Sequence, residues 1–384
     1  MQKPQRGAAF QTLAHHYAHR QEAARAAHAA GRKVIGRIGH TVPTELIMAA
    51  GAVPILITAD LDRKTPVADI YVDPELPPET RTLFEAGVDG DFEFLDLLVL
   101  SRPYDKLYYF LKEIYRLGRA PKMPPFAIYD LMQSQREAVR VYNEDRIRDL
   151  VKRIGRIAAK VDDAALVAAI ETTNSTRALQ RRLGNLRATG TVGGVEAMQA
   201  IGAGYFMDPQ SYAQALASFI SEAAAGPALS ARHNVLLITA EPLGHTNVHQ
   251  LIEAAGANVV AEDDTWGARA AGDDISTKLD PLQAILDKYW SDVPTTGVWP
   301  PAARETWMME QAARSDIDAI VMYIPPSDRM LGWDTPRLAK TFRDMGKPVQ
   351  LLFHDALRDK GRSAIASELE PFFAGIPGRK EAAR

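Results

Sequence analysis

The sequence predicts an α/β fold of two lobes, each with a mostly parallel sheet, joined by a helical segment. The chain of 384 residues is longer than one ordinary hydrophobic core organises. Strand-like and helix-like patterns alternate in two separate regions, which is typical of parallel sheets, and only helical periodicity lies between them. We therefore place an N-terminal helical extension at 1–32, the first lobe at 33–133, a helical connector at 134–227, and the second lobe with a C-terminal helix at 228–384.

The first lobe begins with a compact strand, helix, strand unit. Residues 33–38 have the pattern of a buried strand, 44–50 form a short helix closed by Gly51, and 53–58 form a second strand. Three further elements are expected in this lobe, a strand at 95–100, a helix at 104–117 and a strand at 124–129.

The segments around the first lobe are predicted to be helical. Residues 7–31 are rich in alanine and end at a glycine, so we expect one surface helix there. Its cluster of His15, His16 and His19 is expected on a solvated face rather than on a metal. In the connector, the glycine-rich stretch 190–194 follows no strand and lacks a Lys-Ser/Thr pair, which favours a loop over a phosphate site.

The second lobe repeats the opening pattern of the first. A strand is expected at 234–239, a helix at 247–255 ending at Gly256, and a strand at 258–261, and later elements are helices at 281–290, 303–313 and 335–345 and strands at 319–324 and 349–353. The sequence Ala-Ala-Gly-Ala occurs at the same place in both lobes, at 49–52 and 254–257. This match indicates either an internal repeat or a shared way of ending a helix before a strand.

The composition excludes several classes of function. A net charge of −3 gives no general attraction to nucleic acid or to an anionic membrane. The longest apolar stretches reach only about eleven residues, short of the roughly 20 that cross a bilayer, and no secretory signal pattern opens the chain, so we expect a cytoplasmic protein. The absence of cysteine excludes disulfides, thiol nucleophiles, thiolate zinc sites and cysteine-ligated iron–sulfur clusters on this chain.

A histidine pair in the second lobe has the spacing of a zinc site but lacks its context. His245 and His249 are four residues apart at the start of a predicted helix. A metalloprotease motif would place Glu directly after the first histidine, where this chain has Thr246. Helix capping and surface exposure are therefore favoured over a metal.

The segment from Gly36 to Pro54, GRIGHTVPTELIMAAGAVP, resembles the N-terminal signature of the 2-hydroxyacyl-CoA dehydratase and benzoyl-CoA reductase subunit family. Further stretches that resemble this family follow in its order, over roughly residues 30 to 356: 121–125 (PKMPP), 129–131 (YDL), 174–177 (NSTR), 194–197 (GVEA), 251–257 (LIEAAGA) and 318–321 (DAIV).

The resemblance implies two flavodoxin-like or Rossmann-like lobes and, in most members, a [4Fe–4S] cluster held between them by cysteines. At the positions that resemble the family's cysteines, this chain carries Pro77, Tyr104, Thr265, Thr295 and Ser327. The residues around those cysteines remain as Arg81, Asp105, Gly267, Arg269 and Asp328. None of the five replacements is a ligand of the kind that clusters use.

The resemblance further implies that members act as pairs of homologous subunits. We expect a heterodimer in which a cluster-bearing subunit supplies the [4Fe–4S] centre for acyl-CoA dehydration or reduction, or else a homodimer, and we expect this chain to hold no cofactor and not to be catalytic alone. The alternative is a stand-alone protein that binds an acyl-CoA or related anion between the lobes without redox chemistry. Tryptophans of the second lobe, either in the core or at the subunit interface, are Trp290, Trp299, Trp307 and Trp333.

Candidate site residues follow from the same comparison and from the place where open α/β sheets bind ligands. His40, Thr41 and Glu45, at the end of the first strand, are the candidate catalytic residues. Candidate substrate-binding residues are Arg81, Tyr104, Asp105 and Arg269, with Asp105 and Asp328 available as partners for the two arginines. Tyr104 and Trp266 are expected to fill part of the volume that a cluster would occupy.

Overall fold

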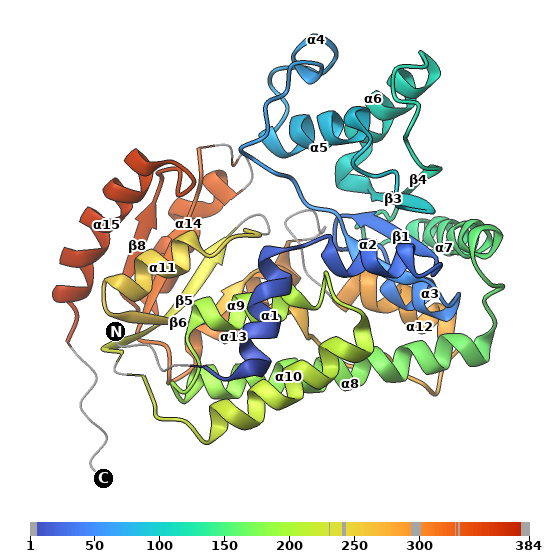
Figure 1. The fold of residues 1–384 in the computed structure, drawn as a ribbon. Coiled ribbons are helices and arrows are strands. Elements are labelled where there is room, and N and C mark those ends of the chain that lie inside the picture. Colours follow the sequence, from blue (N-terminus) through green and yellow to red (C-terminus); the bar gives the residue numbers. More distant parts are fainter. Residues whose placement is uncertain are drawn as a thin grey trace.

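The protein has two four-stranded sheets, and every strand pair within them is parallel, as the computed structural model of the chain shows. The structure describes residues 6–229, 231–239, 243–292, 301–326, 328 and 331–377. Figure 1 shows the second sheet and its helices on the left, the first sheet on the right, and the connector helices α8 (Asp163–Ala188) and α10 (Pro209–Ala224) running beneath both. The prediction of two parallel α/β lobes is confirmed.

The first sheet has the strand order β2-β1-β3-β4. Its strands are β1 (Val34–Ile38), β2 (Val53–Leu56), β3 (Leu97–Ser101) and β4 (Phe126–Tyr129). The helices of this part of the chain are α3 (Thr44–Ala49), α4 (Ala68–Tyr71), α5 (Pro78–Asp89), α6 (Asp105–Arg116) and the single 3-10 turn η1 (Arg102–Tyr104).

The second sheet has the equivalent order β6-β5-β7-β8. Its strands are β5 (His233–Thr239), β6 (Ala257–Asp263), β7 (Ala319–Tyr323) and β8 (Val349–Leu352). The helices that follow β5 are α11 (Asn247–Ala254), η2 (Ala268–Ala270), α12 (Pro281–Asp287), the π-helix η3 (Lys288–Asp292), α13 (Ala302–Ala313), α14 (Leu331–Asp344) and α15 (Asp359–Ala374).

The two lobes share a hydrogen-bonding device as well as a strand order. The carboxylate of Asp96, just before β3, accepts from the backbone N–H of Val34 at 2.9 Å, at the start of β1. Asp318, just before β7, accepts in the same way from Asn234 near the start of β5, at 2.7 Å. The identical role of these two aspartates supports an internal repeat, beyond the short Ala-Ala-Gly-Ala match.

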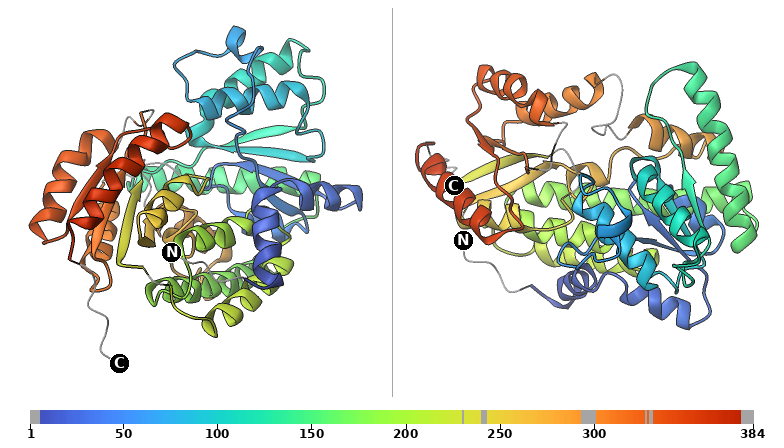
Figure 2. Two further views of the ribbon diagram at one scale, coloured as in Figure 1. Left: turned by 60° about the vertical axis from the view of Figure 1, so that its left-hand side comes forward. Right: turned by 90° about the horizontal axis from the view of Figure 1, so that it is seen from above.

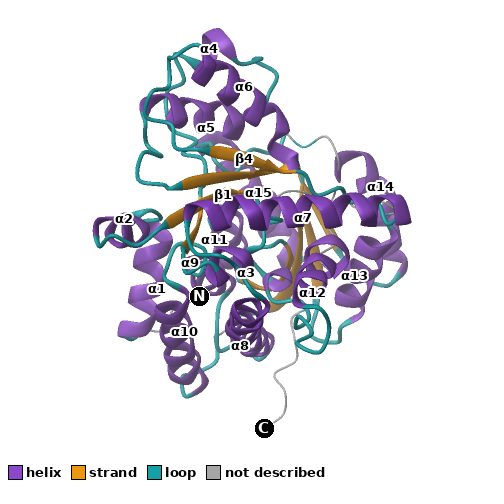
Figure 3. Cartoon of the chain, turned by 90° about the vertical axis from the view of Figure 1, so that its right-hand side faces the viewer, coloured by secondary structure: helices purple, strands orange, loops and turns teal. Residues whose placement is uncertain are grey.

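Helices cover both faces of both sheets (Figure 3), so the strands are buried on each side. One face of the second sheet packs on α13 and α14 and the other on α11 and α15. The connector consists of α7 (Glu137–Ile157), α8, α9 (Gly194–Ala203) and α10, and α8 to α10 build a core of their own with the N-terminal helix α1 (Ala8–Ala18).

One helix crosses from the second lobe to the first. Ile285 and Leu286 of α12 and Trp290 of the following π-helix pack with Ile35 and Leu46 in a single core on the first sheet. The sequence pattern assigned this helix to the second sheet. Its position on the first sheet ties the two lobes together, as the two additional views show (Figure 2).

The N-terminal extension differs from the single helix expected over 7–31. It forms two helices, α1 and α2 (Glu22–Ala29), with a corner at residues 19–21. At this corner Arg20 donates to Thr58 Oγ1 of the first lobe at 3.1 Å and to the carbonyl oxygen of Gly244 in the second lobe. The turn therefore lets one side chain reach both lobes, which a continuous helix would not allow.

Among the described residues, no helix has both the length and the apolar character needed to cross a membrane.

Candidate functional site

The two lobes meet around the indole of Trp266, which follows β6 and is only 2% exposed. Aromatic rings surround it at centroid distances of 5.1 Å for Tyr205, 5.7 Å for Phe206 and 6.1 Å for Tyr17. His40, from the loop after β1, completes the group at 6.0 Å. Trp266 therefore fills space between the lobes, at the junction where the family resemblance places a cluster.

His40 lies at this junction with a neutral imidazole. The chain reaches it through Gly39, whose φ of +90° is a left-handed conformation that glycine adopts without strain. Burial lowers the pKa of His40 to about 3, and the positive charges of Arg37 and Arg269 act in the same direction. At neutral pH His40 is thus a hydrogen-bond donor through one N–H and not a general acid.

Glu45, in the first turn of α3, is fully buried and bound on both oxygens. Arg177 of α8 donates to Oε1 at 2.5 Å, and the Tyr289 hydroxyl donates to Oε2 at 2.8 Å. Burial alone would raise the pKa of Glu45, but the Arg177 charge and these hydrogen bonds hold it below its ordinary value. The ionised carboxylate of Glu45 therefore links the first lobe to the connector through Arg177 and to η3 through Tyr289. Thr41, the third candidate, is half-buried in the loop beside His40.

The candidate substrate-binding arginines have carboxylate partners close to them in sequence. Arg81 of α5 binds Asp69 of α4 and the carbonyl oxygens of Val72 and Asp73, and it makes no contact with Asp105. Arg269 of η2 donates to Asp263 at 2.8 Å.

The two remaining candidates for substrate binding lie at the start of α6. Tyr104 is half-buried and its ring lies against Gly39, whereas Asp105 is exposed and accepts from the backbone N–H of Lys106. The structure therefore brings Tyr104 and Arg269 to the junction with His40, while Arg81 and Asp105 sit in local contacts.

Three of the five positions that resemble cluster ligands are described. Pro77 is exposed at the start of α5, and Tyr104 and Thr265 lie at the junction. The carbonyl oxygen of Thr265 accepts from the Tyr205 hydroxyl, and its own hydroxyl is buried without a hydrogen-bond partner among the described residues. Thr295 and Ser327 lie outside the described residues, as does Trp299.

Three consecutive buried acids at the end of β6 were missed by sequence reasoning. Glu262 binds Arg187 and His249, and Asp263 binds Arg269 and Arg304. Asp264 accepts from the backbone N–H groups of Leu243 and Trp266, each at 2.9 Å.

The pKa values of two of these acids are shifted in opposite directions. Burial raises the pKa of Asp264 to about 6, although its hydrogen bonds from the backbone N–H groups of Leu243 and Trp266 act in the opposite direction. For Glu262 the Arg187 charge and the His249 hydrogen bond outweigh burial and lower the pKa to about 2. In the sequence, the one indication of these three acids was the run Glu-Asp-Asp directly after the strand predicted at 258–261.

The histidine pair of the second lobe is less exposed than the sequence predicts. His249 is fully buried, and its Nε2 bonds Glu262 Oε1 at 2.9 Å. His245 Nδ1 accepts from the backbone N–H of Asn247, and burial lowers the pKa of His245 to about 4. The expectation of surface exposure is therefore wrong for His249, because its helix face packs on β6.

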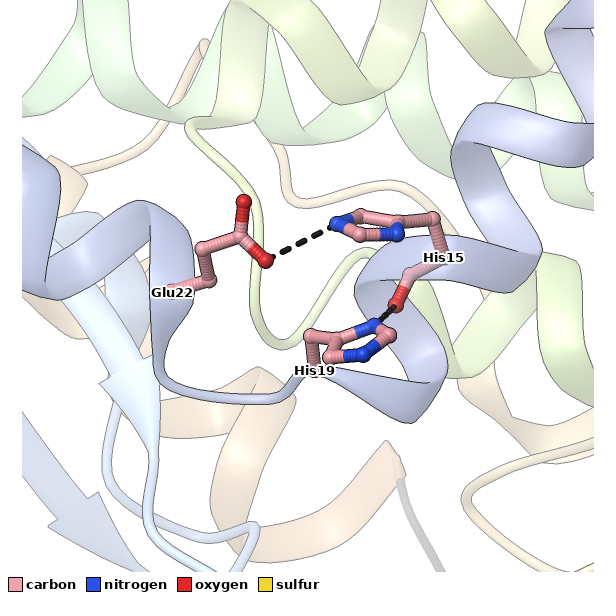
Figure 4. Close-up of side chains that lie close together, drawn as sticks. All are labelled: His15, His19 and Glu22. Carbon is pink, nitrogen blue, oxygen red and sulfur yellow. Dashed lines mark hydrogen bonds and ion pairs between the residues drawn. The ribbon is translucent and has the colours of Figure 1, made fainter.

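In the N-terminal extension, the structure groups His15 and His19 with Glu22 (Figure 4), and the ring of His16 lies edge-on to that of His15 at a centroid distance of 5.4 Å. Within the described part of the chain, these are the three side chains whose possible metal-ligand atoms lie within 4.8 Å of one another. All three are exposed, and His15 Nε2 bonds Glu22 at 2.8 Å while His19 Nδ1 bonds the His15 carbonyl oxygen at 2.9 Å. Each of the two histidines thus has one ring nitrogen in a hydrogen bond within the group.

Comparison with known families gives this geometry a context. The model of the family described as 2-hydroxyglutaryl-CoA dehydratase, D-component, matches residues 40–373. The chain belongs to this family. The match begins at His40 and includes every candidate site residue, whereas α1 and α2 precede it.

One curated member of the dehydratase family gives a second comparison. The subunit beta of (R)-2-hydroxyglutaryl-CoA dehydratase from Acidaminococcus fermentans is 22% identical over 273 residues, which are 69% of this chain and 72% of that protein. The family resemblance predicted from residues 36–54 is therefore confirmed.

Proposed function

We propose that this chain is a subunit of a dehydratase-type complex that has lost its own [4Fe–4S] cluster and acts beside a cluster-bearing homologous subunit. Membership of the D-component family and likeness to a protein named as subunit beta support a role as one subunit of such a complex. The packing of Trp266 between the lobes is the single observation that most favours cluster loss.

The residues at the junction do not fit an iron–sulfur cluster. Clusters are held by cysteine thiolates, and the sequence contains no cysteine. At the described positions that resemble ligands, Tyr104 lies against Gly39 and the carbonyl of Thr265 is bound by Tyr205. We therefore assign no electron-transfer step to this chain.

What this chain contributes is a set of fixed polar groups at the end of β1. His40 presents a neutral imidazole between the lobes, which suits donation to a thioester carbonyl or to a departing hydroxyl rather than proton release. Thr41 lies next to His40 in the same loop, where it is placed to orient the imidazole. Glu45 holds the start of the following helix in place through Arg177 and Tyr289. In this proposal the substrate is an acyl-CoA, and the electron that its reaction needs is supplied by the cluster of the partner subunit.

The proposal is tested by purifying the chain alone and together with a cysteine-rich homologue from the same cell. We expect iron and sulfide to co-purify with the homologue. Sedimentation at a series of protein concentrations should show a heterodimer at micromolar concentration. Stoichiometric iron on the isolated chain would contradict cluster loss. A well-folded monomer that does not associate with the homologue would contradict the subunit proposal and favour the stand-alone acyl-CoA-binding protein.

Trp333 of α14 provides an interface variant for the same experiment. Its side chain is 87% exposed, whereas Trp290 is buried and Trp307 packs on the core of the second lobe. Since exposed tryptophans are enriched at interface hot spots, we expect Trp333→Ala to weaken subunit association about tenfold or more. Tyr109→Ala, an exposed aromatic residue on the first lobe, is the matched control that leaves association unchanged.

A further inference from the structure

Arg37 of β1 is a buried cation without a carboxylate partner among the described residues. Its side chain is 4% exposed. Within the part of the chain that the structure describes, its Nε has no hydrogen-bond partner, and its one hydrogen bond is a long contact of 3.4 Å from Nη1 to the carbonyl oxygen of Gly39. The ring of Tyr205 lies 5.4 Å from the guanidinium carbon. A buried charge of this kind is costly unless a counter-charge compensates it.

The nearest acidic group does not supply that compensation. Glu45 acts on Arg37 through its charge, but its two oxygens are taken by Arg177 and Tyr289. Glu45 is therefore the ion-pair partner of Arg177, and the positive charge of Arg37 is left over. Arg269 adds positive potential at His40 in the next loop, so the local field favours an anion.

Two buried hydroxyl groups on the same face of the first sheet as Arg37 also lack partners among the described residues. Ser101 and Tyr129 are each 1% exposed, and neither hydroxyl has a hydrogen-bond partner within the part of the chain that the structure describes. They are register neighbours at the ends of β3 and β4, and Arg37 is the register neighbour of Val99, two residues before Ser101. Because side chains alternate along a strand, all three residues face the same side of the sheet.

Gly39 brings the Ser101 hydroxyl close to the end of β1. A methyl group at Gly39 would overlap Ser101 Oγ and approach the Tyr104 ring, so only glycine permits this arrangement. Residues 39–41, in the loop that carries His40 at this edge of the sheet, are half-buried, whereas Arg37, Ser101 and Tyr129 are buried. Open α/β sheets bind ligands at this edge, beyond the carboxyl ends of their strands.

We propose that Arg37, Ser101 and Tyr129 form an oxyanion-binding site, which takes the carboxylate or phosphate group of a small molecule. One guanidinium and two hydroxyl groups supply donors on one face of three adjacent strands, and an oxyanion accepts from all of them. The site goes beyond the pairing proposed above, since it is complete within this chain and is tested without a partner.

The test is calorimetric titration of the full-length chain alone with acetate, inorganic phosphate and coenzyme A in separate arms, at constant ionic strength. We expect at least one of these anions to bind with a stoichiometry of one, and the arm that binds distinguishes a carboxylate from a phosphate source. Arg37→Met should weaken binding at least tenfold. Ser101→Ala and Tyr129→Phe should each weaken it severalfold.

Stability without anion provides the second readout. Since the hydroxyl of Tyr129 has no partner, Tyr129→Phe should leave the melting temperature unchanged, and Arg37→Met should raise it because an uncompensated charge is removed. The matched control is Tyr212→Phe, whose buried hydroxyl accepts from Gln180 at 3.3 Å in the connector. This control should lower the melting temperature and leave anion affinity unchanged.

The proposal is overturned if no anion binds the wild-type chain, or if Arg37→Met lowers stability while anion binding stays intact. If Arg37→Met does not fold, Ser101→Ala and Tyr129→Phe carry the test, because both keep the charge of Arg37. Loss of anion affinity in these two variants supports the site, and unchanged affinity in both overturns it.

Discussion

The imidazole of His40 meets the indole of Trp266 edge to face across the two lobes, with ring centroids 6.0 Å apart and planes at 76°. One residue follows the first strand of the first sheet and the other follows β6 of the second. Their contact, together with Tyr205 and Tyr17, is the aromatic core of the lobe junction. The first prediction concerns this core.

Trp266→Ala should destabilise the isolated chain by about 3–5 kcal/mol, because it empties a closely packed site between the lobes. The measurement is urea unfolding followed by circular dichroism. Trp333→Ala is the matched control, and since that side chain is 87% exposed it should change stability by no more than about 0.5 kcal/mol. Equal effects of the two substitutions would show that the junction is not packed as described.

Glu262→Gln should cost about 3–5 kcal/mol, because it leaves the buried Arg187 without its carboxylate partner. The exposed pair of Glu305 with Arg337 supplies the control, and Glu305→Gln should cost about 1 kcal/mol or less. Unfolding free energies at pH 7 compare the two. A small loss for Glu262→Gln would mean that solvent reaches Arg187.

Asp264 makes stability depend on pH in an unusual direction for an acid. Its pKa in the folded chain is about 6, against an ordinary value of 3.8. Between these values the folded state binds more protons than the unfolded state, so this group adds stability as pH falls from 6 toward 4. Asp264→Asn should remove that contribution and make the acid-side loss of stability steeper, by at most about 1.4 kcal/mol per pH unit. Unfolding free energies at half-unit steps measure the slope, and an unchanged slope contradicts the prediction.

His40 acts in the opposite direction over the same range. Its folded pKa of about 3 lies below the ordinary 6.5, so the unfolded state takes up a proton that the folded state excludes. Stability is therefore lost as pH falls below 6.5, and His40→Gln should reduce this loss. His245, whose pKa falls to about 4, contributes in the same sense, so the variant should flatten the slope without abolishing it. A steeper slope would show that His40 is protonated in the folded chain.

Local patterns in the sequence determined the elements and their class. Residues 97–101 and 319–323 are strands where mainly apolar runs predict them, because strands buried on both faces need such runs. Residues 34–38 and 233–239 are also strands at the places predicted, although the first includes Arg37 and the second begins with His233 and Asn234. Gly51 and Gly256 have positive φ angles of 73° and 92° where helices were expected to end. The family was also evident from residues 36–54, whose sequence resembles the N-terminal signature of the family.

The tertiary structure alone decided which residues meet. Arg81 binds Asp69, Glu45 binds Arg177 across 132 positions of sequence, and α12 packs on the first sheet although it follows the second lobe's strands. The unpartnered donors of Arg37, Ser101 and Tyr129 share a face only because β1, β3 and β4 lie side by side. Ion pairs and helix packing depend on how segments far apart in the sequence are arranged. That arrangement is set by the burial of apolar surface, and the hydrophobic effect is not directional. Periodicity along the chain records which face of an element is buried, but not against which partner.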